Sequence, residues 1–322
     1  MTDENTAIQH IACMADVHCR DSKSDRRSED MLRLRRDVML FPEGKQKAFT
    51  MSYDDGVTQD ERLITLMEQY GIRGTFNLNP GLMGDNDWLV QGGVGVNHNK
   101  FSKDKIAEIY KNQEIAVHSM THPDLTKVPV GMVSYEITEC RKELEELVKH
   151  PVTGMAYPFG TWSTEVEQVA GLCGITYART TKPTYAFSMP QDFLAWHPTC
   201  HHTDEKMFEL LDKFLEVINQ ERYMEPWLYY LWGHAYEFDS YNQWNEIERF
   251  LKTVGNREEI WYATNGEICE YINAVKSLVY SATGDYIYNP TCIDVWMQVD
   301  GKAYEIKEGA EHGTSCGSSN NK

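Results

Sequence analysis

Two adjacent carboxylates, Asp54 and Asp55, end an apolar, β-prone run at residues 47–53 and are followed by Gly56. Like charges side by side at the end of a strand repel each other, so the pair is unfavourable unless something neutralises it. The pair makes chemical sense if one carboxylate holds a cation and its neighbour transfers protons beside it. Such a site needs partners from elsewhere in the chain.

Two histidines four residues apart, His118 and His122, follow a second β-prone run. This spacing lets both imidazoles reach one cation from a helical turn or a tight loop. Two histidines and one carboxylate of the aspartate pair leave an open position for water on a divalent metal, as hydrolysis requires. The other carboxylate would then be free to take a proton from that water, and His234, after another β-run, could protonate the leaving group.

A rival metal cluster lies at residues 197–202, where three histidines stand near Cys200. It lacks a carboxylate, and its proline distorts the spacing, so we favour the first set of ligands. His201 is instead a candidate for contact with substrate at the mouth of the site. Glu237 is a second such candidate, with a solvated loop as the alternative.

The chain from residue 47 to residue 278 alternates between apolar, β-rich segments and helix-like segments. The predicted strands cover residues 47–53, 74–79, 114–118, 153–158, 175–180, 193–199, 227–233 and 259–264. The predicted helices cover residues 58–70, 102–112, 132–149, 162–173, 204–221, 241–255 and 265–278. Repeated β-α units indicate an α/β fold with a parallel sheet, and about eight strands favour a closed or nearly closed barrel over an open doubly wound sheet. In such a barrel the polar ends of the strands converge, which would bring the carboxylates and histidines together.

Four parts of the chain are predicted: an N-terminal arm at 1–45, the barrel at 46–278, a small C-terminal β appendage at 279–308 and a flexible tail at 309–322. The arm has mixed charge, with a short helix near 27–36. The appendage is predicted from period-two alternation around the hairpin turn Asp300-Gly301. The tail is rich in Gly, Ser and Asn.

The composition excludes some classes of partner. A net charge of −18 argues against nucleic acid and against binding to anionic membrane surfaces, but leaves neutral or cationic substrates open. No apolar run approaches the roughly 18 residues of a membrane span, and no signal peptide is evident. The eight cysteines are scattered, which is typical of reduced thiols, so we expect a cytoplasmic protein.

Four motifs occur in order: Ser52-Tyr53-Asp54-Asp55-Gly56, His118-Ser119-Met120-Thr121-His122, Tyr157-Pro158-Phe159-Gly160 and Leu231-Trp232-Gly233-His234. They resemble the motifs of the polysaccharide deacetylases, the NodB-homology or carbohydrate esterase family 4 enzymes, over about residues 45–275. The resemblance implies a deformed barrel of seven or eight strands and a divalent metal, most commonly zinc, with Co²⁺, Ni²⁺ or Mn²⁺ as alternatives. It also implies an acetylated carbohydrate substrate, from which N-linked or O-linked acetyl groups are hydrolysed without cleavage of peptide bonds.

The resemblance assigns the metal to three side chains: Asp55, His118 and His122. It makes Asp54 the general base and His234 the general acid. The backbone N–H of Phe159 would stabilise the oxyanion. Trp232 would form an apolar wall around the acetyl methyl group, with Tyr157 as a further substrate-binding residue.

Two departures from the family pattern stand out. Ala156 occupies the position where the family has an arginine before the Pro-aromatic-Gly motif, so the base lacks the partner that usually lowers its pKa. Arg179, at the end of the next predicted strand, is our candidate replacement. The family's fourth motif has no clean match, and Trp196 cannot be aligned with it.

Two other functions stay open at this point. One is a related metal hydrolase of a non-sugar amide, such as an allantoinase-like enzyme acting on a cyclic ureide. The other is a non-catalytic glycan-binding member of the family, against which the two aspartates and three histidines argue. The native metal, the acetylated substrate and the oligomeric state do not follow from the sequence.

Overall fold

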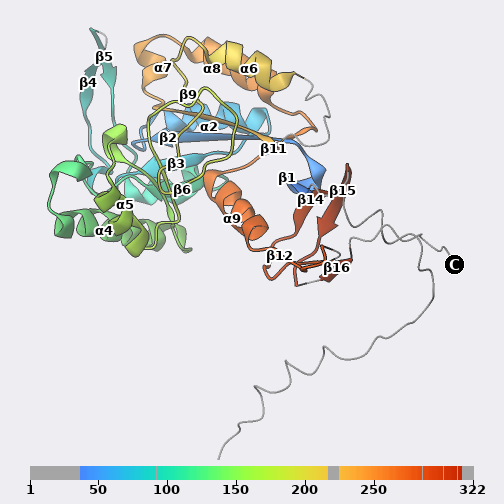
Figure 1. Ribbon diagram of the computed structural model, residues 1–322. Helices are drawn as coiled ribbons and strands as arrows, with labels where there is room; N and C mark the ends of the chain where they lie inside the picture. The colour runs from blue at the N-terminus through green and yellow to red at the C-terminus, as the bar shows by residue number, and fades with distance from the viewer. Residues whose placement is uncertain are drawn as a thin grey trace, which may run out of the picture. The chain divides into compact units, whose positions relative to one another are not determined.

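The computed structural model describes residues 37–91, 93–216, 225–284, 286–299, 301–309 and 311–313. Its centre is a parallel sheet with strand order β8-β7-β6-β3-β2-β10-β9, in which β11 also pairs with β2 (Figure 1). The strands are β2 Lys47–Asp54, β3 Thr75–Leu78, β6 Glu114–Val117, β7 Gly154–Ala156, β8 Tyr177–Arg179, β9 Cys200–His201, β10 Trp227–Gly233 and β11 Ile260–Tyr262. Every residue of β2 is buried, as a central strand of a parallel sheet requires.

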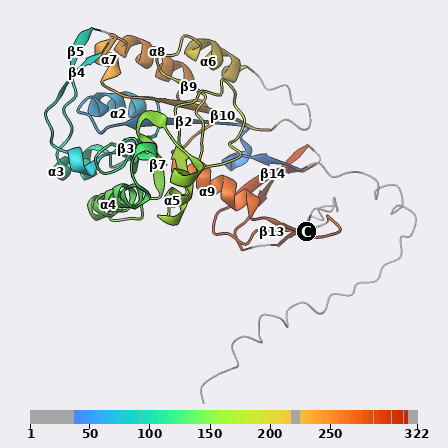
Figure 2. The ribbon, with the colours of Figure 1, turned by 60° about the vertical axis from the view of Figure 1, so that its left-hand side comes forward.

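Helices cover the sheet on its outside, with α6, α7 and α8 on one side and α4, α5 and α9 on the other (Figure 2). The helices are α2 Asp60–Gln69, α3 Lys103–Ile109, α4 Val130–Val148, α5 Thr164–Leu172, α6 Met207–Leu215, α7 Glu237–Ser240, α8 Trp244–Val254 and α9 Asn265–Lys276. Their apolar residues recur at helical spacing; in α8, for example, Ile247, Phe250, Leu251 and Val254 are all buried. The predicted deformed (β/α) barrel is confirmed.

One predicted strand, at residues 193–199, is wrong. Only Trp196 forms a bridge, to Arg179 of β8, and the strand at this point is β9, Cys200–His201. The apolar residues that suggested a strand, Phe193 and Trp196, are instead buried in a hydrophobic cluster. Pro198 lacks the N–H that a sheet ladder needs, which favours a loop here.

A hairpin that the sequence analysis missed separates β3 from α3. Its strands are β4 Trp88–Gln91 and β5 Val94–Asn97, which pair antiparallel. The hairpin projects at the upper left of Figure 1, beside α7. Its alternation is weak because apolar residues lie on both faces: Trp88 and Val90 are exposed, whereas Leu89 and its cross-strand partner Val96 pack with the core.

The C-terminal β structure consists of two small antiparallel sheets. One has the order β1-β14-β15, from Asp37–Leu40, Val295–Val299 and Lys302–Ile306; the other has the order β12-β13-β16, from Val279–Tyr280, Tyr286–Tyr288 and Glu311–Gly313. Tyr271 of α9 joins the first sheet to the barrel, because its hydroxyl donates to Leu40 O at 2.6 Å and accepts from Trp296 N at 2.8 Å.

The strands of these two sheets come from outside the predicted C-terminal appendage in two places. β1 comes from the predicted N-terminal arm, and β16 comes from the predicted tail. Both gain backbone hydrogen bonds from strands distant in sequence, which local patterns cannot reveal. The predicted helix near 27–36 lies outside the described residues, and the domain boundaries at 45, 278 and 308 stay predictions. Within the described ranges, no helix has the length and apolar character needed to span a membrane.

Candidate active site and metal centre

The carboxyl ends of the parallel strands meet around one cavity of about 780 Å³. Asp54 ends β2, His118 follows β6 and His234 follows β10. The lining includes these three residues and others from the sequence prediction: Asp55, His122, Tyr157, Phe159 and Trp232. The sheet therefore brings together residues as much as 180 positions apart, as the barrel rule predicts.

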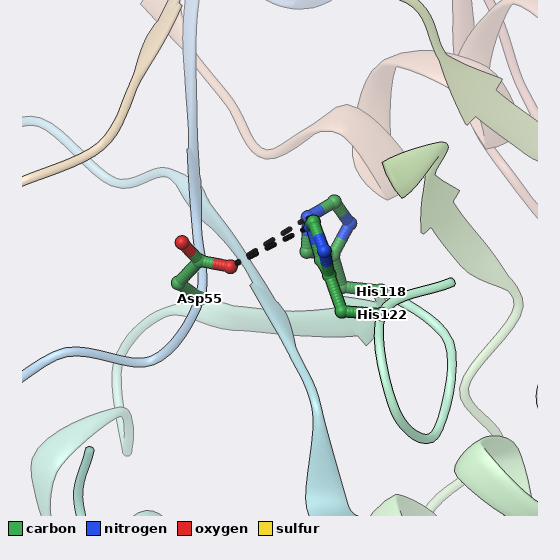
Figure 3. Close-up of side chains that lie close together, drawn as sticks. All are labelled: Asp55, His118 and His122. Carbon is green, nitrogen blue, oxygen red and sulfur yellow. Dashed lines mark hydrogen bonds and ion pairs between the residues drawn. The ribbon is translucent and has the colours of Figure 1, made fainter. Parts of the chain in front are cut away.

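Asp55, His118 and His122 point toward one another (Figure 3) and form a group that could hold a metal ion. Asp55 Oδ1 lies 3.9 Å from Nε2 of each histidine, and the two Nε2 atoms are 3.1 Å apart. A tetrahedral zinc site with bonds of about 2.0–2.1 Å places its ligand atoms roughly 3.3 Å from one another. The observed separations therefore lie close to those of a metal site.

The two histidines are also in the neutral state that binding of a metal cation requires. His118 Nδ1 lies 2.8 Å from Ala156 O, so this nitrogen carries the proton and Nε2 presents its lone pair to the site. Burial lowers the pKa of His118 and brings that of His122 to about 4, so both rings are neutral near neutral pH. Neutral imidazoles beside a carboxylate are the donors that Zn²⁺ and related divalent ions prefer.

Asp55 is held by two residues that the sequence analysis missed. His98 Nε2 lies 3.2 Å from Asp55 Oδ2, and Lys100 Nζ donates to Asp55 O at 2.9 Å. Burial alone would raise the pKa of Asp55, but the His98 hydrogen bond and the Lys100 charge hold it well below its ordinary value. Both residues come just after the unpredicted hairpin. The only sequence signal that could have identified them is that a histidine and a lysine, which can both bind a carboxylate, lie close together in the chain.

Asp54 contacts the guanidinium of Arg179 and accepts a hydrogen bond from Asn77 Nδ2 at 2.8 Å on its other oxygen. Ala156 and Arg179 are direct partners in the β7–β8 ladder, so the arginine lies one strand away from the position the family uses. Burial alone would raise the pKa of Asp54, but Arg179 and then His118 lower it, so the carboxylate is ionised. Asn77 is a further residue that the sequence analysis missed.

His234 lies between two carboxylates. Its Nε2 is 3.8 Å from Asp54 Oδ2, and its Nδ1 is 3.4 Å from Glu237 Oε2. Burial alone would lower the pKa of His234, but the hydrogen bond and charge of Glu237 raise it to about 9. His234 is therefore an imidazolium at neutral pH, with a proton available on the nitrogen that faces the cavity.

Glu237 and His201, predicted to contact substrate, do not line the cavity. The Glu237 side chain is only 8% exposed, and its Oε2 lies 3.1 Å from His201 Nε2 and 3.2 Å from His202 Nε2. Glu237 Oε2 thus lies close to three histidines, His201, His202 and His234, of which only His234 lines the cavity. Gln91 of β4 donates to its other oxygen, Oε1, at 3.0 Å.

His201, His234 and Glu237 form a second group whose atoms are close enough to hold an ion. However, the backbone N–H of Thr203 donates to His201 Nδ1 at 3.2 Å, which in the neutral ring places the proton on Nε2. That proton faces Glu237, so a hydrogen-bonded cluster describes the group better than a metal site. The alternative metal ligands at residues 197–202 do not converge on one point either, because His197 Nδ1 lies 2.6 Å from Thr180 Oγ1.

The remaining predicted residues form the cavity walls. The Tyr157 hydroxyl donates to Leu194 O at 2.8 Å, so its ring rather than its hydroxyl is available to substrate. The Trp232 ring packs on Arg179, whose Cζ lies 4.4 Å from the ring centroid. Phe159 is 63% exposed, and its ring centroid lies 4.6 Å from that of His122.

Several residues of this site have strained backbone conformations. Asp55, Ser119, His122 and Phe159 have φ values of 80°, 62°, 59° and 59°. Residues other than glycine rarely adopt this left-handed region, and such strained positions cluster at functional sites. The surrounding contacts hold the turn that carries the histidines, for example the His122 N–H donating to Ser119 Oγ at 3.0 Å.

Comparison with known proteins agrees with this geometry. The family model for polysaccharide deacetylase matches residues 42–178. The chain is related to the polysaccharide deacetylases. The predicted resemblance to this family is thereby confirmed, and the matched residues carry the first three motifs, with both aspartates and both candidate metal-binding histidines; the fourth motif lies beyond the match.

Solved structures similar to this chain include a protein of Mycobacterium smegmatis described as a polysaccharide deacetylase, which shares its fold. It is 15% identical, with a TM-score of 0.51, over 74% of this chain and 94% of that one. A Streptococcus pyogenes deacetylase in complex with acetate is 17% identical, with a TM-score of 0.39, over 45% of this chain and 61% of that one. A Bacillus cereus polysaccharide deacetylase is 20% identical, with a TM-score of 0.37, over 45% of this chain. The match spans only 44% of the Bacillus cereus protein's own length.

Proposed function

We propose that this protein is a metal-dependent deacetylase that hydrolyses acetyl groups from N-acetylated or O-acetylated sugars. The observation that carries the proposal is the cavity in which the Asp55, His118 and His122 group lies beside an ionised carboxylate, Asp54, and an imidazolium, His234. Its relation to the polysaccharide deacetylases supports the reaction and the class of substrate.

Asp55, His118 and His122 would hold the divalent ion, with zinc as our first expectation. A bound ion of this kind supplies Lewis-acid activation of water and of the acyl oxygen. Asp55 would ligate through Oδ1, since His98 occupies the side of Oδ2. His98 and Lys100 would then hold the ligand carboxylate in a fixed orientation.

Asp54 would act as the base that accepts the proton of the attacking water. It can do so because Arg179 and Asn77 hold it ionised and fixed, on opposite oxygens. His234 would donate the proton from Nε2 to the departing nitrogen or oxygen, while Glu237 retains the proton on Nδ1. The Phe159 N–H would stabilise the oxyanion, and Tyr157 and Trp232 would enclose the acetyl group.

Acetate release tests this function directly. We expect the zinc-loaded protein to release acetate from N-acetylated chitooligosaccharides or from acetylxylan, and the chelator-treated protein to release none until zinc is restored. Asp54→Asn should abolish release while retaining zinc, which separates the base from the ligands. Hydrolysis of allantoin without acetate release would point to the ureide alternative. Glycan binding without any hydrolysis would identify a non-catalytic member.

A further inference from the structure

The turn that joins the two candidate metal-binding histidines, residues 118–122, contains two residues in a strained backbone conformation (Figure 3). Ser119 and His122 have φ values of 62° and 59°, in the left-handed region that residues other than glycine rarely adopt. Such a conformation persists only where surrounding contacts hold it. The contacts of this turn therefore decide whether His122 faces the ion site.

The first half of the turn is attached to the sheet. His118 N donates to Leu78 O of β3 at 3.1 Å, and His118 Nδ1 lies 2.8 Å from Ala156 O of β7. Asn79, directly after β3, donates through Nδ2 to the backbone oxygens of His118 and Ser119. We therefore expect His118 to keep its place even when the rest of the turn moves.

The second half of the turn is attached to α4 by Glu136. Glu136 Oε2 accepts from Thr121 N at 2.8 Å, and Oε1 accepts from Thr121 Oγ1 at 2.7 Å. The backbone oxygen of Glu136 accepts from Met120 N at 3.0 Å, and Gly81 N donates to Met120 O at 3.0 Å. The contacts of Met120 use backbone atoms, so they survive a change of the Glu136 side chain, whereas those of Thr121 do not.

The carboxylate of Glu136 is committed to this turn. Glu136 is only 4% exposed, and a buried carboxylate is unfavourable unless its oxygens are hydrogen-bonded. Both oxygens accept from Thr121, the residue directly before His122. Glu136 does not line the cavity, so it is not placed to touch a bound ion or a substrate.

We propose that Glu136 is a positioning residue that keeps His122 directed toward the metal ion. This role rests on the metal-dependent function proposed above. By holding both the N–H and the hydroxyl of Thr121, Glu136 fixes the chain that enters His122. Without these bonds the strained turn can relax to ordinary φ values and carry the His122 imidazole away from Asp55 and His118. An arriving ion must then reorder the turn, which lowers its affinity.

Zinc affinity of the purified protein, measured by competition with a chromophoric chelator, tests this role. Glu136→Ala should weaken zinc binding by about 10- to 100-fold, the range found when a residue that orients a metal ligand is lost. Glu136→Gln should stay close to the wild type, because its Oε1 can accept from Thr121 N while its amide donates to Thr121 Oγ1. If Glu136 acted through its charge, glutamine would instead be as harmful as alanine.

Glu146→Ala is the matched control, because Glu146 is an exposed carboxylate on the same helix. It should leave zinc affinity unchanged. Glu136→Ala should fold, since alanine favours a helix and the exposed Thr121 can donate to water instead. Wild-type affinity in folded Glu136→Ala, or an equal loss in Glu136→Gln, overturns the role.

A variant outside the helix keeps the role testable if Glu136→Ala does not fold. Thr121→Val removes the hydroxyl that donates to Glu136 Oε1, at an exposed position of the turn. It should weaken zinc binding, whereas Thr121→Ser, which keeps the hydroxyl, should not. Wild-type zinc affinity in Thr121→Val overturns the role in that case.

Hydrogen exchange of the metal-free protein, followed by NMR, gives a second readout. His122 N donates to Ser119 Oγ at 3.0 Å, a bond that no change at residue 136 removes directly. We expect this N–H to exchange several-fold faster in Glu136→Ala, and at the wild-type rate in Glu136→Gln and Glu146→Ala. An unchanged rate in Glu136→Ala overturns the role.

Measuring acetate release beside zinc affinity separates this role from the proposed function. If the wild type releases no acetate but binds zinc in a Glu136-dependent way, the deacetylase function fails and the positioning role stands. If the wild type releases acetate and its zinc affinity does not depend on Glu136, the function stands and the role fails.

Discussion

Replacing Glu237 by glutamine should shift the alkaline limit of activity. Glu237 Oε2 lies 3.4 Å from His234 Nδ1 and is the main cause of the raised pKa of that histidine, about 9. Glutamine preserves the shape of the side chain and can still meet Gln91, but it removes the charge that stabilises the imidazolium. Burial, which lowers the pKa of His234, is then no longer offset by the charge of Glu237, so this pKa falls.

The size of the shift follows from these values. A return of the pKa from about 9 toward the ordinary 6.5 is a change of about 2.5 units, or roughly 3 kcal/mol of lost preference for the protonated form. A general acid works only while it carries its proton, so activity falls as pH rises through its pKa. At about pH 8 the protonated fraction falls from about nine-tenths to about 3%, so we expect about 30-fold lower kcat there. Near pH 5.5 the loss should be small.

The assay is the pH profile of kcat for acetate release, recorded with zinc-loaded protein. NMR titration of the His234 ring gives the same pKa without turnover. Glu270→Gln, at an exposed position on α9, serves as the control and should keep the wild-type profile. An alkaline limit that stays near 9 in Glu237→Gln, or a His234 pKa that does not move, would refute this account of the acid.

Three further changes test other parts of the site and the fold. Arg179→Ala removes the cation beside Asp54, so the acidic limit of activity should move to higher pH and kcat should fall by about 10- to 100-fold; an unchanged pH profile would show that Arg179 is not the partner of the base. His118→Ala should lower the bound zinc from one ion per chain to none, as measured by elemental analysis of dialysed protein. Glu114→Ala leaves the donors of Thr75 and Gly266 unpaired at the opposite end of the barrel, and should lower the free energy of unfolding in urea by about 2–4 kcal/mol while zinc content is kept.

The barrel was predictable because its signals are local. A strand of the parallel sheet is a short apolar run, and the predicted 47–53 corresponds closely to the observed Lys47–Asp54. The helices bury one face at the helical period, so α8, predicted at 241–255, is observed at Trp244–Val254. The position of polar residues at strand ends then followed from the fold class.

The hydrogen-bond and ion-pair partners of the site residues were not predictable from local sequence patterns. His98 and Lys100 hold Asp55 from just after a hairpin whose strands carry apolar residues on both faces and therefore show no clear alternation. Glu237, predicted to contact substrate, is instead a buried residue of α7 whose Oε2 lies beside His201 and His202. Hydrogen-bond partners so far apart in sequence depend on how elements pack, and periodicity carries no information about that.

The sequence by itself determined which side chains could do the chemistry and that strand ends would carry them. The sequence offered Arg179 as a candidate partner for Asp54, but only the tertiary structure decided that its guanidinium reaches this carboxylate. Ala156 leaves the usual cation missing, yet the parallel register pairs Ala156 with Arg179 on the next strand. Adjacent strands lie about 4.8 Å apart, a distance that an arginine side chain spans easily. Arg179 on β8 therefore reaches the same carboxylate that an arginine at position 156 on β7 would reach. A strand pairing, not a motif, supplies that contact.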